Sequence, residues 1–209
     1  MTPSTDPPAV VQLMAADAAE ATRVFCDAFR EYETMRYVIG PNVPDYDVRL
    51  ERLVSFFLMA RVLRGEPFFG VRTGNRLAAV ATTSDPMGAV PAPDLSLYRE
   101  ACWEALGAAA RDRYDRCGEI WNRLAVAVPR VHLNMIGVIR TAQGQGLASR
   151  LLDRVHRLAR ETPGAVGVSL TTESPQNVPL YQRAGYAIVG HAAIEPGFET
   201  WSFFRRNDS

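Results

Sequence analysis

The feature that most constrains the fold is a junction in the second half of this 209-residue chain. Residues 131–138 are mainly apolar and are predicted to form a strand. Beyond the junction, apolar residues recur at spacings of one, three and four: Leu147, Leu151, Leu152, Val155 and Leu158. This spacing is typical of an amphipathic helix, which we expect to end near Arg160. The sequence therefore predicts a strand that meets a helix through the loop Gln143-Gly144-Gln145-Gly146.

A glycine-containing loop at the start of a helix is suited to bind an anion. The first four backbone N–H groups of a helix have no partner within it, and the helix dipole places partial positive charge there. Glycine lets the backbone turn tightly and lets a ligand approach closely. The junction therefore predicts a phosphate or pyrophosphate site. Its spacing matches neither G-x-G-x-x-G nor G-x-x-x-x-G-K-[ST], which argues against a dinucleotide fold and a P-loop NTPase.

The loop resembles the coenzyme A pyrophosphate loop of the GNAT superfamily of N-acetyltransferases. Its pattern, Q/R-x-x-G-x-G/A, is met by Gln143, Gly146 and Ala148. The resemblance implies that acetyl-CoA is the co-substrate and that no metal takes part. The cofactor-binding residues that it implies are Ile136, Gly137, Val138, Gln143, Gly144, Gln145, Gly146, Leu147, Ala148, Ser149, Asn177 and Tyr181.

A second motif follows the next predicted strand and has the form Asn-x-x-x-Tyr-x-x-x-Gly-Tyr. From the residues alone it predicts a short helix with Asn177 as its N-cap and Gly185 at its end. The motif is similar to the C-terminal motif of GNAT enzymes. That resemblance implies that Asn177 binds the pantetheine arm and that Tyr181 is the general acid for the leaving thiolate.

Within the superfamily, the chain resembles the puromycin N-acetyltransferase type of actinomycetes. The resemblance rests on residues 174–183, on residues 27–29 and on Trp201. Two positions depart from that pattern: Thr171 stands where that group usually has Glu, and Arg140 stands where relatives usually carry Pro.

Two residues are candidates for the base that deprotonates the acceptor amine. His132 lies six residues before Val138, on the same strand face if no bulge intervenes, and its ordinary pKa suits proton transfer near pH 7. Some arylalkylamine-type GNAT enzymes place a histidine here, and a structural histidine is the alternative. Glu173 is the second candidate, although we favour a solvated turn residue. Many GNAT enzymes instead relay the proton through ordered water.

In the superfamily, the acceptor pocket is formed by the first two helices, the loop between them and the insert before the fourth strand. Aromatic residues are frequent in these segments: Tyr32, Tyr37, Phe56, Phe57, Trp103 and Trp121. For each of them taken alone, we favour ordinary core packing. As a set they predict an apolar or aromatic acceptor, and we expect Tyr32, Phe57, Trp103 and Glu173 to contact it.

The overall charge limits the partners. Lys plus Arg and Asp plus Glu both number 23, which argues against nucleic acid, an anionic membrane or a polyanionic acceptor. No apolar run reaches about 18 residues and no signal sequence opens the chain, so we expect a cytoplasmic protein. The three cysteines, Cys26, Cys102 and Cys117, form no C-x-x-C pair, and the helical spacing around Cys26 and Cys102 predicts that these two are small buried residues in a reducing compartment.

Apolar periodicity elsewhere predicts alternating helices and strands. The expected helices cover residues 17–32, 48–63, 94–117, 119–128 and 177–184. The expected strands cover residues 10–14, 68–72, 77–83, 166–171, 187–194 and 199–204. Between them we expect a break at 32–46, a hairpin turn at 73–76, a loop at 84–94 and a helix break at Gly118.

The resemblance implies an α/β (α+β) GNAT fold, in which helices flank a mixed, mostly antiparallel twisted sheet of about six or seven strands. We expect a flexible terminus at 1–9 and a single domain at 10–209, with an acceptor-binding half at 10–130 and an acetyl-CoA-binding core at 131–209. The predicted function is acetyl transfer from acetyl-CoA to a primary amine of a small molecule, such as an antibiotic or other natural product, by direct attack in a ternary complex. Alternatives are a protein or peptide amine acetyltransferase, a non-catalytic CoA-binding module and an enzyme that uses a longer acyl donor. For the oligomeric state, a homodimer is the alternative to a monomer.

Overall fold

The computed structural model describes residues 9–84 and 92–207. Residues 1–8 of the predicted flexible terminus and most of the predicted loop at 84–94 therefore lie outside the described residues. Within these ranges the chain forms a seven-stranded sheet in the order β1-β2-β3-β4-β5-β7-β6. The strands are β1 (Val10–Gln12), β2 (Phe68–Thr73), β3 (Arg76–Ser84), β4 (Val131–Val138), β5 (Gly167–Thr172), β6 (Ala187–Glu195) and β7 (Phe198–Arg206).

Strand pairing is antiparallel throughout this sheet except between β4 and β5, which run parallel. This confirms the predicted mixed, mostly antiparallel sheet. The predicted hairpin is also present: Thr73 pairs with Arg76 across a turn in which Gly74 has a φ of 60°. A positive φ is accessible to glycine without steric cost, which explains why this turn could be predicted from the sequence.

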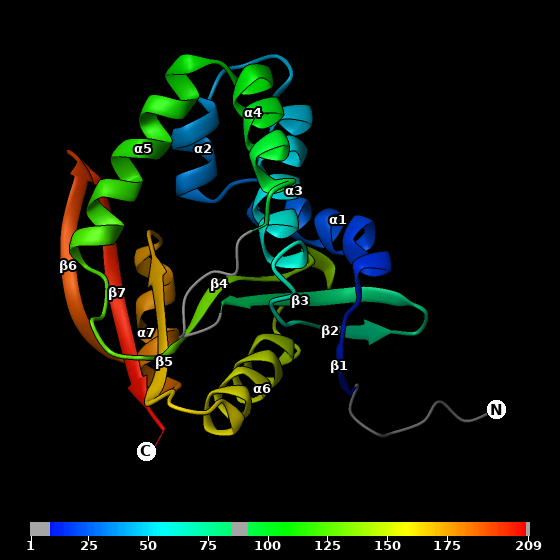
Figure 1. Ribbon diagram of the computed structural model, residues 1–209, viewed down its shortest axis with the longest axis vertical. Helices are drawn as coiled ribbons and strands as arrows, with labels where there is room; N and C mark the ends of the chain where they lie inside the picture. The colour runs from blue at the N-terminus through cyan, green and yellow to red at the C-terminus, as the bar shows by residue number, and fades with distance from the viewer. Residues whose placement is uncertain (1–8, 85–91, 208–209) are drawn as a thin grey trace.

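The middle of the sheet is split between β4 and β5. These two strands pair at only two positions, Val131 with Val168 and His132 with Ser169. On its other side β4 carries a β-bulge, because Thr82 pairs with Met135 while Thr83 pairs with Leu133, which leaves Asn134 as the extra residue. Beyond His132 the edge of β4 that faces β5 is unpaired, and β5, β7 and β6 turn away from it (Figure 1).

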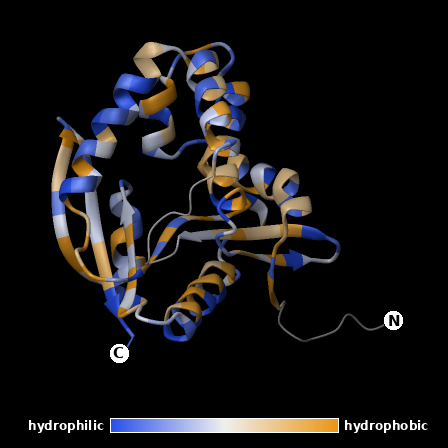
Figure 2. Cartoon of the chain, in the orientation of Figure 1, coloured by the Kyte–Doolittle hydropathy of each residue, from blue (hydrophilic) through white to orange (hydrophobic). Residues whose placement is uncertain are grey.

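Helices cover both faces of the sheet. The helix after the glycine loop, α6 (Leu147–Glu161), lies on one face, and α1 (Ala18–Phe29) and α3 (Tyr46–Val62) lie on the other (Figure 1). Each face has its own apolar core, with Leu151 in the first and Phe25 in the second, and both side chains are fully buried. Figure 2 shows the alternation of apolar and polar positions along α6 that predicted this packing.

The first half of the chain differs from its prediction in two places. Glu33–Ile39 forms a short helix, α2, inside the segment that we expected to lack regular structure, because Met35, Val38 and Ile39 find an apolar core to pack against. The second difference is the helix break, which lies at Gly107 (φ 82°) between α4 (Leu95–Leu106) and α5 (Ala108–Arg123). Gly118 lies within α5, so its predicted role as a breaker is wrong; of these two glycines, Gly107 is the one with the positive φ that ends a helix.

Candidate active site

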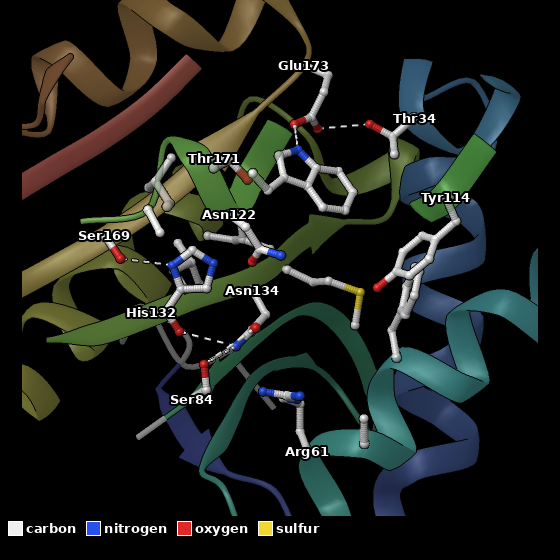
Figure 3. Close-up of a pocket in the computed structure, with 18 of the residues that line it drawn as sticks. Thr34, Arg61, Ser84, Tyr114, Asn122, His132, Asn134, Ser169, Thr171 and Glu173 are labelled. Atoms are coloured by element: carbon white, nitrogen blue, oxygen red, sulfur yellow. Dashed lines mark hydrogen bonds between the residues drawn. The ribbon is translucent and has the colours of Figure 1, made fainter. Parts of the chain in front are cut away.

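A cavity of about 840 Å³ opens where β4 and β5 diverge. Its walls come from α3, α4, α5, β4, β5 and α7 (Val178–Arg183), together with the segment between α1 and α2. Figure 3 shows His132 and Asn134 of β4 on one side of this cavity, with Glu173 and Thr34 across from them. The halves of the chain that were expected to bind acceptor and cofactor therefore meet at one cavity.

The glycine loop has the backbone that its sequence predicted. Gly144 and Gly146 have φ values of 77° and 75°, and a Cβ built on either would meet no atom within 4 Å. No N–H from Gly144 to Ser149 has a backbone partner among the described residues; the next, that of Arg150, donates to the Gly146 carbonyl at 3.2 Å. Several N–H groups at the start of α6 are thus without a backbone acceptor among the described residues. Leu147 can contribute only its backbone, because its side chain lies in the core.

Asn177 lies at the start of α7 and its side chain lines the cavity. The side chain does not cap the helix, so that part of the prediction is wrong. Asn177 has helical backbone angles, and its Nδ2 donates instead to Thr172 Oγ1 at 3.3 Å. An N-cap needs an extended backbone before its side chain can reach the helix N–H groups.

Tyr181 lies on α7 and lines the cavity, although only 6% of its surface is exposed. Its ring packs against Tyr186 and Phe203, with centroids at 5.9 and 5.6 Å. Burial, with a smaller contribution from the charge of Glu173, raises the pKa of the Tyr181 phenol. Among the described residues the hydroxyl has no hydrogen-bond partner. Tyr181 therefore holds a proton at neutral pH and has no competing acceptor for it.

Glu173 is not the solvated turn residue that we favoured. Only 5% of its surface is exposed, and its carboxylate accepts four hydrogen bonds. Oε2 accepts from Tyr32 Oη at 3.0 Å and from Thr34 Oγ1 at 2.8 Å. Oε1 accepts from Trp121 Nε1 at 2.9 Å and from Thr200 Oγ1 at 2.7 Å. Two donors on each oxygen use the acceptor capacity of a carboxylate, so the group has no lone pair free to take a proton from an amine.

His132 differs from its prediction in position. The bulge at Asn134 shifts the alternation of β4, so His132 shares its face with Met135 rather than with Val138. The expectation that His132 and Val138 lie on one face is therefore wrong, because it depended on an unbroken strand.

The basicity of His132 also differs from expectation. Burial, followed by the charges of Arg130 and Arg61, lowers the pKa of His132 to about 4. Ser169 Oγ accepts from Arg130 Nε at 2.8 Å and lies 2.8 Å from His132 Nδ1, to which it can donate its own proton. The histidine is thus neutral at pH 7 and only weakly basic, whereas the sequence had indicated a pKa near 7.

The predicted aromatic residues mostly gather at the cavity. Tyr32, Phe56, Phe57, Trp103 and Trp121 line it. Tyr37 does not, because its hydroxyl donates to Glu195 Oε1 at 2.6 Å in a cluster that also contains Arg116. This cluster joins α2 and α5 to β6.

Tyr114 is a cavity residue that the sequence analysis missed. Its ring lies at the centre of the aromatic wall, with centroid distances of 5.5 Å to Phe57, 5.1 Å to Trp103 and 5.9 Å to Trp121. Burial raises the pKa of its phenol. The residue lies on α5 between Arg113 and Asp115, so no local apolar pattern marks it, and only the packing of α5 against α3 and α4 reveals its position.

Within residues 9–84 and 92–207, no group of three or more His, Cys, Asp or Glu side chains could hold a metal ion. In the same ranges no helix has the length and apolar character required to cross a membrane.

Comparisons with known proteins agree with this geometry. Residues 114–202 match the acetyltransferase (GNAT) domain family. A 58-residue segment is 38% identical to blasticidin-S acetyltransferase from Streptomyces morookaense, and it covers 28% of this chain and 43% of that protein. The chain thus matches less than half the length of this curated relative.

Two solved structures share the fold over nearly the whole chain. A Corynebacterium glutamicum protein described as histone acetyltransferase HPA2 and related acetyltransferase has a TM-score of 0.66 at 20% identity, with 96% of this chain and 97% of that chain covered. The polyamine N-acetyltransferase of Drosophila melanogaster has a TM-score of 0.65 at 16% identity, with coverages of 95% and 98%. The chain therefore has the GNAT fold, and its second half matches the GNAT acetyltransferase domain family.

Proposed function

We propose that this protein transfers the acetyl group of acetyl-CoA to a primary amine of a small molecule, by direct attack in a ternary complex. The observation that carries the proposal is the divergence of β4 and β5 around Tyr181. The unpaired edge of β4 and the buried phenol of Tyr181 meet at one cavity, and the loop with unpartnered N–H groups follows β4 in the chain. These are the parts that an acyl transfer from a thioester requires.

The cofactor would bind along the β4 edge and across the start of α6. The N–H groups from Gly144 to Ser149 would receive the pyrophosphate, because they combine free donors with the positive end of the helix dipole. The unpaired edge at Ile136–Val138 would hold the pantetheine arm and polarise the thioester carbonyl with a backbone N–H. Asn177 lines the same cavity and would contact the arm from α7.

In the chemical step, the amine nitrogen attacks the thioester carbon, a C–N bond forms, and the C–S bond breaks as the tetrahedral intermediate collapses. Tyr181 would give its proton to the departing thiolate and recover one, through water, from the acetylated ammonium. Burial raises the pKa of Tyr181, and burial of the thiolate in the same cavity raises the pKa of the thiol. The two groups therefore remain matched for proton transfer.

The acceptor amine must lose a proton without a strong side-chain base. The lone pairs of Glu173 are all engaged, and His132 is a weak base. The charges of Arg61 and Arg130, which help to lower the pKa of His132, would also lower the pKa of an ammonium group placed beside it. We therefore assign deprotonation to water, favoured by this cationic surrounding.

A small-molecule acceptor fits the cavity better than a peptide does. Its volume of about 840 Å³ lies within the range of small-molecule sites, and aromatic side chains form one wall. A protein acceptor would favour a wide acidic groove, whereas arginines predominate among the charged residues of this cavity. The relative that acetylates blasticidin S and the resemblance to puromycin N-acetyltransferases both support an amine of a natural product.

Calorimetric titration with acetyl-CoA, followed by measurement of thiol release, tests the proposal. We expect micromolar binding and amine-dependent thiol release with at least one member of a panel that includes puromycin and blasticidin S. Binding without release from any amine would favour the non-catalytic CoA-binding alternative. An absence of binding would contradict the assignment of the glycine loop.

A further inference from the structure

The charges around the cavity do not balance, although those of the whole chain do. Five arginines line the cavity: Arg61, Arg64, Arg99, Arg111 and Arg130. The carboxylates among the lining residues are Asp115 and Glu173. The imbalance is therefore local, and it lies at the place where we propose that the acceptor binds.

Pairing within the protein neutralises only part of this positive charge. Arg61 Nη1 lies 2.9 Å from Glu66 Oε2, and Arg111 Nε lies 3.6 Å from Asp115 Oδ2. The Glu173 carboxylate is occupied by four neutral donors rather than by an arginine.

Arg64 is the cavity arginine whose guanidinium lacks the hydrogen-bond partners that a buried polar group requires. Its Nε atom is buried and has no hydrogen-bond partner. Across the described ranges, no ion pair or hydrogen bond of its side chain is found. Arg61 lies close enough for the charge of Arg64 to contribute to the lowered pKa of the Arg61 guanidinium. A partly buried guanidinium beside a second cation is stabilised by an added anion.

The cofactor does not supply that anion. The phosphates are assigned to the loop at 143–149, and no residue of this loop is among those that line the cavity. The part of the cofactor that would reach the cavity, the acetylated pantetheine arm, is neutral. The unmatched charge of Arg64 therefore points to the other substrate.

We propose that the acceptor amine carries an oxyanion group, either a carboxylate or a phosphate, which binds the guanidinium of Arg64. The inference rests on the proposed function and adds the substrate class to it. The body of the acceptor would lie against the aromatic wall formed by Phe57, Trp103 and Tyr114. A guanidinium binds a carboxylate and a phosphate alike, through two parallel hydrogen bonds. An experiment is therefore needed to distinguish the two oxyanions.

A matched set of aromatic amines tests the proposal by direct binding. The probes are 4-(aminomethyl)benzoate, its neutral methyl ester and 4-(aminomethyl)phenylphosphonate, titrated calorimetrically into the full chain with and without saturating CoA. We expect at least one anionic probe to bind about tenfold or more tightly than the ester, and the tighter of the two identifies the oxyanion. Arg64→Gln should abolish the preference, and Arg64→Lys should retain part of it.

Arg52→Gln is the matched control, because Arg52 is an exposed arginine of α3 outside the cavity lining. It should leave the preference for the anion intact. Equal affinity for acid, phosphonate and ester, or a preference that survives Arg64→Gln, would overturn the inference. Thiol release with all three probes at equal efficiency would overturn it while supporting the proposed function. Failure of acetyl-CoA to bind would contradict the proposed function alone, since the binding preference is measured without cofactor as well.

Discussion

The carboxylate of Glu173 accepts a hydrogen bond from the indole of Trp121 at 2.9 Å across 52 residues of sequence. This bond connects α5 to the end of β5, on the two sides of the cavity. Tyr32, Thr34 and Thr200 donate to the same carboxylate, so one side chain joins the first half of the chain to the sheet. Glu173 is thus a positioning residue that holds Tyr32 and Trp121 in the cavity wall.

Glu173→Gln should lower the free energy of unfolding by about 2–4 kcal/mol, because a buried amide N–H₂ would then face the donors of Trp121 or Tyr32. Denaturant unfolding followed by tryptophan fluorescence measures the change. Glu199→Gln is the control, since Glu199 is half exposed and forms its ion pair with His191 at the surface, and it should change stability by less than about 0.5 kcal/mol. Equal losses in the two variants would contradict the role of Glu173.

Tyr181→Phe should lower kcat by about 100-fold and leave the Kd for acetyl-CoA nearly unchanged, because only the proton donor is removed. The assay is thiol release with the best amine, combined with calorimetry. Tyr186→Phe removes a neighbouring phenol that contacts His156 Nε2 at 2.9 Å instead of lining the cavity. It should affect stability but not kcat, and full activity of Tyr181→Phe would exclude the general-acid role.

Gly146→Glu should weaken acetyl-CoA binding by more than about tenfold, because the new carboxylate would repel the pyrophosphate at the start of α6. Gly164→Glu is a close control: Gly164 has a φ of 78°, against 75° for Gly146, and neither has an atom within 4 Å of a built Cβ. Both variants carry the same backbone strain and the same charge. If both lose the same affinity, the loop is not the pyrophosphate site.

The lowered pKa of His132 predicts the pH dependence of stability. The pKa is about 4 in the folded chain against an ordinary value of 6.5, so the unfolded chain binds the proton more tightly. The contribution of His132 to the free energy of unfolding is therefore complete above pH 6.5. It decreases by up to about 3 kcal/mol as the pH falls toward 4. His156, with a pKa of about 4, contributes in the same window.

Unfolding free energies of wild type and His132→Gln, measured between pH 4 and 7, test this dependence. The variant should have the smaller acid loss, with the part due to His156 remaining. Its pH–rate profile between pH 6 and 8 should keep the wild-type inflection, because His132 does not titrate there. An inflection that disappears in the variant would restore His132 as the base.

The parts of the fold that were predicted correctly depend on local sequence. The hairpin around Gly74, the loop at Gly144 and Gly146, and α6 each follow from the positive φ of a glycine or from the spacing of apolar residues within one helix. The short helix that carries Tyr181 was likewise recognisable from its own residues. Such features need no information about distant segments.

The orientation and burial of the cavity residues depend on residues that are far away in the sequence. The face on which His132 lies depends on a bulge, and a bulge is defined by the register with β3 rather than by β4 alone. The local sequence predicts that Glu173 is a solvated turn residue. It is buried because Tyr32, 141 positions away, and Trp121 pack against it and donate hydrogen bonds to it.

The sequence by itself thus determined the backbone of the glycine loop and the short helix that carries Tyr181, because backbone conformation and helical periodicity are local properties. Only the tertiary structure decided that Glu173 is buried, that His132 is a weak base, and that Tyr114 and Arg64 line the cavity. Burial and electrostatic surroundings depend on which distant elements pack together, and no single segment of the sequence contains that information.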